Sequence, residues 1–161
     1  MSSLGFLPDI TIIIVGFILL YKFRKPIAKL FARIPLSAVF LAPLISLPFI
    51  FLEETINCID YGDGLGCRMT TWINVVLLIQ VFILCLIVHK KKMTDIKRPL
   101  FWYAVIGLIW EMTLGGLSVL VLTLNPFLLF MGPYVMVSYA FLAVIPLTIV
   151  VLRNTVYSED L

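Results

Sequence analysis

Five long apolar stretches dominate the chain and limit what it can fold into. They lie near residues 6–21, 35–52, 69–88, 100–123 and 133–152, and Pro8 and Asp9 interrupt the outer end of the first. An α-helix rises about 1.5 Å per residue, so about 17 or more apolar residues cross the roughly 30 Å hydrocarbon core of a bilayer. The sequence therefore predicts an all-α integral membrane bundle of about five transmembrane helices.

The composition supports a membrane solvent and leaves no room for a second domain. Hydrophobic residues make up 62% of the 161 residues and charged residues only 13%, whereas about a quarter of the residues in soluble proteins are charged. The apolar stretches use most of the chain, and the connections between them are short. We therefore expect residues 1–161 to form a single membrane domain in contact with the lipid bilayer.

Positive charge gathers in the segments that follow the first, third and fifth apolar stretches. These segments hold eleven of the twelve Lys and Arg, namely Lys22, Arg24, Lys25, Lys29, Arg33, Lys90, Lys91, Lys92, Lys97, Arg98 and Arg153. The positive-inside rule places them in the cytoplasm, with the N-terminus outside and the C-terminus cytoplasmic. We expect a multi-pass protein of the plasma (cytoplasmic) membrane whose basic loops attract anionic lipid headgroups. A nucleic-acid partner is not expected, because no basic fold presents these charges.

A single acidic residue, Glu111, stands inside the fourth apolar stretch, in the sequence LIWEMTLGGL at 108–117. Counted from Pro99 at about 1.5 Å per residue, it lies about 18 Å into the membrane. A charge at this depth costs at least about 2.5–3.5 kcal/mol on insertion scales, so such residues usually face the protein interior and mark functional sites. Glu111 is therefore the leading candidate for binding an ion or a ligand.

Small residues accompany Glu111 at helical spacing. On one continuous helix, intervals of three, four, four and three residues would form a single stripe of Ala104, Gly107, Glu111, Gly115 and Ser118. One interpretation is close helix packing, within the chain or in a homodimer, with a neutral Glu111 donating a hydrogen bond across the contact. The other interpretation is that the small residues make room for a ligand, an ion or a file of water beside Glu111.

Polar residues of three other stretches lie near the same depth as Glu111. Counting along each predicted helix places there the ligand- or ion-binding candidates Gln80, Asn74, Ser138 and Tyr139. Each of these side chains also suits a simple hydrogen bond between helices. Helix order and rotation decide which of them face Glu111, and the sequence leaves both open.

The connection at 53–68, EETINCIDYGDGLGCR, is the longest polar segment. It carries a secondary outer acidic cluster of Glu53, Glu54, Asp60 and Asp63. We expect a solvated acidic loop rather than a cation site, because the D-x-D-x-D-G spacing of a calcium loop is absent. Cys58 and Cys67 lie on the side predicted to face an oxidising compartment, which favours a disulfide that stabilises the fold by about 2–3 kcal/mol.

The remaining motifs narrow the function without naming a substrate. His89 is the single histidine, so no haem, di-iron or zinc pattern is present, and we expect no metal and no cofactor. The leading hypothesis is a buried carboxylate that binds or transports a proton, a cation or a small polar or cationic molecule. One alternative is a membrane-embedded enzyme that acts on a lipid or isoprenoid with a glutamate as general acid. The other is a structural subunit that docks onto a larger membrane complex.

Overall fold

A computed structural model describes residues 6–59, 64–115 and 117–159, with side chains described for 10–53, 55–56, 75–115 and 117–155. The helices of this part are α1 (Phe6–Ala32), α2 (Ala38–Ile59), α3 (Gly64–Lys90), α4 (Lys97–Thr113), α5 (Ser118–Leu122) and α6 (Leu128–Glu159). These residues contain no strand, which confirms the predicted all-α fold class.

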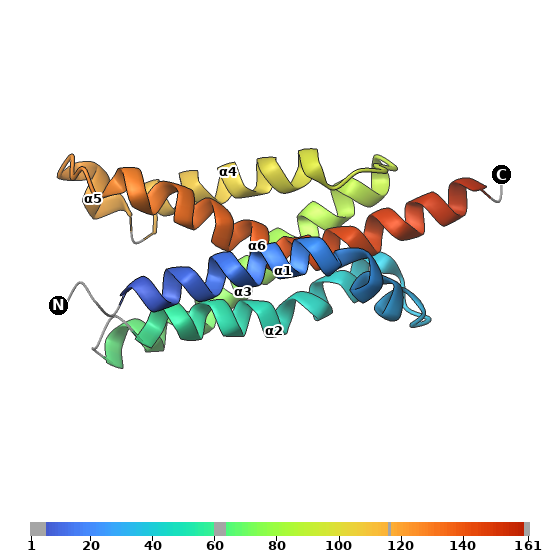
Figure 1. Ribbon diagram of the computed structural model, residues 1–161, viewed down its shortest axis with the longest axis horizontal. Helices are drawn as coiled ribbons and strands as arrows, with labels where there is room; N and C mark the ends of the chain where they lie inside the picture. The colour runs from blue at the N-terminus through green and yellow to red at the C-terminus, as the bar shows by residue number, and fades with distance from the viewer. Residues whose placement is uncertain (1–5, 60–63, 116, 160–161) are drawn as a thin grey trace.

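Helix α6 is the centre of the molecule. The long helices lie side by side along one axis, with α6 running between the pair α1 and α2 and the helix α4 (Figure 1). Helices α1, α2, α3 and α4 all pack against α6, and α2 also packs against α3. Every residue of α6 from Ser138 to Val151 is buried. The core is therefore built around one apolar helix rather than between equal partners.

Several helices extend beyond the predicted apolar stretches. Helix α1 does not end at residue 21 but continues through the basic residues to Ala32, and α6 begins at Leu128 rather than at residue 133. Pro133 lies inside α6. A proline removes one backbone N–H and leaves one carbonyl oxygen without its helical partner, whereas the remaining polar backbone groups of an apolar segment keep their partners by staying helical.

The sequence predicts one continuous helix over the fourth apolar stretch, 100–123, but the structure divides this stretch. Helix α4 ends at Thr113, and the short helix α5 begins at Ser118. The N–H groups of Leu114 and Gly115 both donate to the carbonyl oxygen of Trp110, at 2.8 and 3.1 Å, which closes the last turn of α4. Two successive glycines, 115 and 116, follow, and each disfavours a helix by about 1 kcal/mol relative to alanine.

The three basic segments meet at one end of the bundle. Arg153 of α6 donates hydrogen bonds to the end of α1 and the loop after it, at the carbonyl oxygens of Ala32 (3.1 Å), Ile34 (2.6 Å) and Leu36. Asn154 donates to the carbonyl oxygens of Val88 and Met93, both at 3.2 Å, at the end of α3. Hydrogen bonds thus join α6 to the connections that follow α1 and α3.

One helical segment of the described chain is long and apolar enough to cross a membrane. It runs from Leu128 to Thr155, 28 residues with a mean hydropathy of 2.5. Shorter apolar helical segments cover Ala38–Glu53 in α2 and Val75–Lys90 in α3. By length and composition, the described residues therefore contain one candidate membrane span, and it is the central helix.

Candidate functional site

Glu111 on α4 and Tyr139 on α6 form a hydrogen bond. The Tyr139 hydroxyl donates to Oε1 of Glu111 at 3.2 Å. Tyr139 is only 4% exposed, whereas Glu111 lies at intermediate burial. The carboxyl group is therefore turned toward the central helix, and the structure brings together two of the five predicted binding residues.

Gly107 allows this contact because it lets the Tyr139 ring lie against the backbone of α4. A Cβ atom added at Gly107 would lie 2.2 Å from Cγ of Tyr139, which is far inside van der Waals contact. On the other side, the Tyr103 ring meets the Tyr139 ring edge to face, with 5.6 Å between the ring centroids. Ala104 is also buried. The inner half of the small-residue stripe is therefore close helix packing.

The outer half of the stripe does not continue the same face, because α4 ends before it. The Ser118 hydroxyl donates to the carbonyl oxygen of Gly115 at 2.7 Å, a local bond in the turn between α4 and α5. A Cβ atom added at Gly115 would lie 2.1 Å from Oε2 of Glu111. Gly115 therefore makes room for the glutamate side chain itself, and Ser118 serves the turn.

Glu53 is a buried carboxyl group, contrary to the prediction of a solvated position. Helix α2 continues to Ile59, so Glu53 lies inside a helix and is only 6% exposed. Its carboxyl group lies within electrostatic range of the hydroxyl groups of Tyr103 and Tyr139. Glu53 therefore belongs with Tyr103, Tyr139 and Glu111, and we call these four residues the carboxylate–tyrosine cluster.

Sequence reasoning missed Tyr103, although a signal for it was present. Tyr103, Gly107 and Glu111 follow at intervals of four residues, which places them on one face of a helix. Tyr103 is 3% exposed. Helical spacing from Glu111 therefore indicates Tyr103 as a candidate in the same way as it indicates Gly107.

Three buried polar atoms have no hydrogen-bond partner within the described part of the protein. They are Oε1 of Gln80, the hydroxyl of Tyr103 and Oγ of Ser138. Most buried polar side-chain atoms in native proteins are paired with protein groups, water, an ion or a ligand. Of these three atoms, the Tyr103 hydroxyl belongs to the carboxylate–tyrosine cluster. Adjacent residues on a helix point about 100° apart, so the position of Ser138 next to Tyr139 in the sequence does not place its hydroxyl in the cluster.

Several predicted residues lie outside the described side chains. They are Asn74, Glu54, Asp60, Asp63, Cys58 and Cys67, so the disulfide and the rest of the outer acidic cluster stay predictions. Cys85 is a buried free thiol. The described residues contain no group of three or more His, Cys, Asp or Glu side chains that could hold a metal ion.

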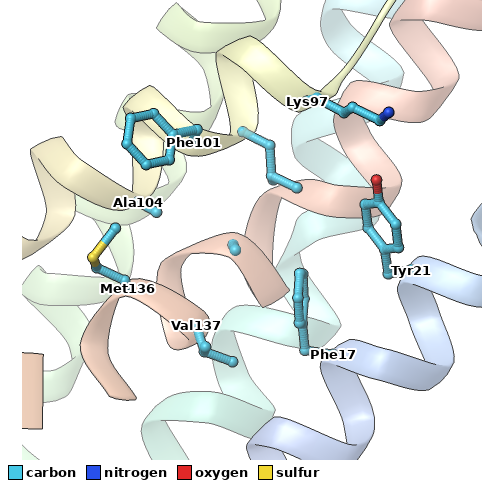
Figure 2. A pocket seen from close by; sticks show the side chains of 9 residues that line it. Phe17, Tyr21, Lys97, Phe101, Ala104, Met136 and Val137 are labelled. Atoms are coloured by element: carbon cyan, nitrogen blue, oxygen red, sulfur yellow. The ribbon is translucent and has the colours of Figure 1, made fainter. Parts of the chain in front are cut away.

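An apolar cavity of about 260 Å³ opens between α1, α4 and α6 (Figure 2). Phe17 and Tyr21 enter it from α1, and Lys97 and Phe101 from α4 (Figure 2). Ala104 of the small-residue stripe also lines it, whereas neither Glu53 nor Glu111 does. The cavity therefore lies beside the carboxylate–tyrosine cluster without including its acids.

Comparisons with protein-family models, with curated proteins and with solved structures found no match for the chain.

Proposed function

We propose that the chain is a five-span membrane bundle. The central helix alone does not distinguish this proposal from a soluble helical protein with a buried core helix. The outer surface supports the membrane bundle, because the outward faces of surface helices in soluble proteins are polar. On the part of α3 whose side chains are described, four outward positions at every fourth residue are apolar and 44–51% exposed: Val75, Ile79, Ile83 and Ile87.

The other long helices carry the same apolar exterior. Side chains that are more than half exposed include Ile12, Ile18, Phe40, Phe51, Ile106 and Ile109. Exposed apolar surface spread around a bundle suits contact with lipid and promotes association in water. Together with basic segments gathered at one end, it supports a multi-pass protein of the plasma membrane with the N-terminus outside and the C-terminus cytoplasmic.

Within this bundle we propose that the carboxylate–tyrosine cluster binds a small cation in exchange for a proton. The observation that carries the proposal is the hydrogen bond from Tyr139 to Glu111. The buried acid Glu53 lies within electrostatic range of Tyr103 and Tyr139. Carboxylates attract a cation by charge, and the faces of tyrosine rings attract it by their quadrupole. A small organic cation uses both kinds of group.

Proton coupling follows from the chemistry of Glu111. The ionised carboxylate accepts the Tyr139 hydrogen bond and attracts a cation, whereas the protonated carboxyl group is neutral. A proton and a cation therefore compete for one side chain. Such competition is the elementary step of proton-coupled binding, and transport needs in addition that the site open to both sides of the membrane.

The proposal is tested by equilibrium binding of tetramethylammonium, a small organic cation, to the full chain in detergent at a series of pH values. We expect Glu111→Gln to bind at least about tenfold more weakly than the wild type at neutral pH, because the neutral amide removes the charge that attracts the cation. Lowering the pH should weaken binding by the wild type, because a proton neutralises a carboxylate, and should leave Glu111→Gln unchanged. The matched control is Asp95→Asn, which removes an exposed carboxylate. Equal binding by the wild type and Glu111→Gln would contradict the proposal.

The same geometry speaks against a glutamate-catalysed reaction on a lipid chain. A lipid chain would need an apolar cavity such as that of Figure 2, but neither Glu53 nor Glu111 lines this cavity. A general acid must reach the reacting atom within hydrogen-bond distance or through one water. We therefore place binding of a cation ahead of catalysis.

A further inference from the structure

A second cavity, of about 1010 Å³, lies at the end of the bundle where the basic segments meet. The end of α1, the loop after it, the end of α3 and α6 form its walls. Five basic side chains line it, namely Lys29, Arg33, His89, Lys92 and Arg153. No carboxylate is among the described residues that line it. We call it the basic cavity.

Arg153 is held in place on the wall of the basic cavity by neutral groups. Its guanidinium donates to the backbone carbonyl oxygens of Ala32, Ile34 and Leu36. Carbonyl oxygens orient the guanidinium but carry no net charge to balance it. The positive charge of Arg153 is therefore fixed in position and adds to the field of the other cations.

Lys92 lines the same cavity from a strained backbone position. Its φ angle is 50°, in the left-handed region that favours glycine. The N–H of Lys92 donates to the carbonyl of His89 and the N–H of Met93 to that of Val88, both at 3.1 Å. This is the Schellman motif, in which glycine is the usual residue at the position of Lys92. Glycine would adopt this conformation without strain, so the lysine side chain can be removed here at no cost to the backbone.

Like charges gathered in one cavity repel one another, and a bound anion offsets that repulsion. Arg and Lys are the side chains that hold phosphate groups, Arg by paired hydrogen bonds and Lys by its charge. Apolar residues also line the cavity, among them Ile34, Leu36 and Leu152. A ligand that suits both kinds of wall carries a phosphate group and an apolar chain.

We propose that the basic cavity binds the phosphate-bearing headgroup of an anionic lipid. The choice of a lipid over a soluble phosphate rests on the membrane placement proposed above, which puts this end of the bundle at the cytoplasmic headgroup layer. Basic pockets between helices on this side of a membrane are known sites for acidic headgroups. The ligand class is a phosphomonoester or phosphodiester lipid with net negative charge.

The test compares two double variants with the same loss of charge in the full chain in a neutral detergent. Lys29→Gln with Arg33→Gln alters the cavity, whereas Lys25→Gln with Arg98→Gln alters exposed residues of the basic segments that do not line it. The probe is a fluorescent short-chain phosphatidic acid. We expect the cavity variant to bind at least about tenfold more weakly and the control within about twofold of the wild type. Equal loss in both variants would show diffuse attraction and overturn the proposal.

Two further arms keep the result interpretable. Lys92→Gly relieves the left-handed strain, so it should raise the melting temperature while weakening phosphatidic acid binding; unweakened binding would remove Lys92 from the site. Soluble glycerol phosphate should compete only weakly. If it binds as tightly as the lipid, the ligand is a soluble phosphate and the lipid assignment is wrong. These variants leave Glu111 intact, so loss of tetramethylammonium binding and loss of lipid binding are separate results.

Discussion

Tyr139 is the residue on which the carboxylate–tyrosine cluster depends. It donates to Glu111, meets the Tyr103 ring edge to face and lies against the backbone of α4 at Gly107. One side chain of the central helix thus sets both the approach of α4 and the direction of its buried acid. At the scale of residues, packing and the proposed binding chemistry are therefore parts of one contact.

Gly107→Ala tests this contact. The added methyl group would lie 2.2 Å from the Tyr139 ring, and α4 must move to relieve the clash, so we expect a loss of about 1–3 kcal/mol in the free energy of unfolding. Gly132→Ala is the matched control, because its new Cβ would meet only Leu108, at 3.8 Å. It should be neutral or stabilising by up to about 1 kcal/mol. Thermal unfolding in detergent, followed by circular dichroism, measures both; equal stability of the two variants would contradict the tight contact.

The sequence predicted Glu111 and Tyr139 for different reasons, and each reason has a limit. Glu111 stands out because a buried acid is unfavourable in hydrocarbon. Tyr139 is predicted from its estimated depth in the membrane, and the same estimate selects Gln80 and Ser138. Depth does not give the rotation of a helix about its axis, so the structure was needed to show that the Tyr139 hydroxyl meets Glu111. Glu53 was misplaced because polar residues follow it in the sequence and suggest a loop, whereas α2 continues past it to Ile59.

At the scale of elements, the break between α4 and α5 is the main departure from the predicted helices. Apolar composition continues without interruption from 100 to 123, so hydropathy gives no sign of an end. The two glycines at 115 and 116 are a sign that the helix ends, but small residues also suit close packing between helices. Composition therefore predicts that these residues are helical but does not give the position at which the helix ends. The backbone hydrogen bonds to the carbonyl oxygen of Trp110 mark that position.

The end of α5 offers a test of how such breaks are held. Leu124 has a φ angle of 48° and is 88% exposed, and the N–H of Asn125 donates to the carbonyl oxygen of Leu120 at 2.9 Å. A side chain in the left-handed region is disfavoured by about 1–2 kcal/mol. Leu124→Gly should therefore raise the free energy of unfolding by about 1 kcal/mol in a denaturant titration.

Leu122→Gly is the control for Leu124→Gly, because it replaces an equally exposed leucine (84%) that ends α5 in helical conformation. Glycine disfavours a helix by about 1 kcal/mol, so this variant should lose stability. If both variants lose stability, the turn at Leu124 is not held in the left-handed conformation. Opposite signs at two neighbouring leucines would confirm how α5 ends.

At the scale of the whole molecule, the proposal joins an apolar exterior, a central helix and two polar regions. The residues of the carboxylate–tyrosine cluster come from α2, α4 and α6, whereas the basic cavity is lined by the ends of α1 and α3 and by α6. The exposed apolar side chains in between are explained by lipid. Both proposed sites therefore presuppose that the long helices cross a bilayer.

Labelling of single cysteines with a membrane-impermeant maleimide, in cells expressing the full chain, tests this claim most directly. The variants carry Lys91→Cys, in the connection after α3, or Pro126→Cys, in the connection before α6, with Cys58 and Cys67 changed to serine and the buried Cys85 retained. We expect Pro126→Cys to label in intact cells and Lys91→Cys to label only after permeabilisation. Labelling of both positions from the same side, or recovery of the protein in the soluble fraction, would contradict the five-span bundle and the buried site within it.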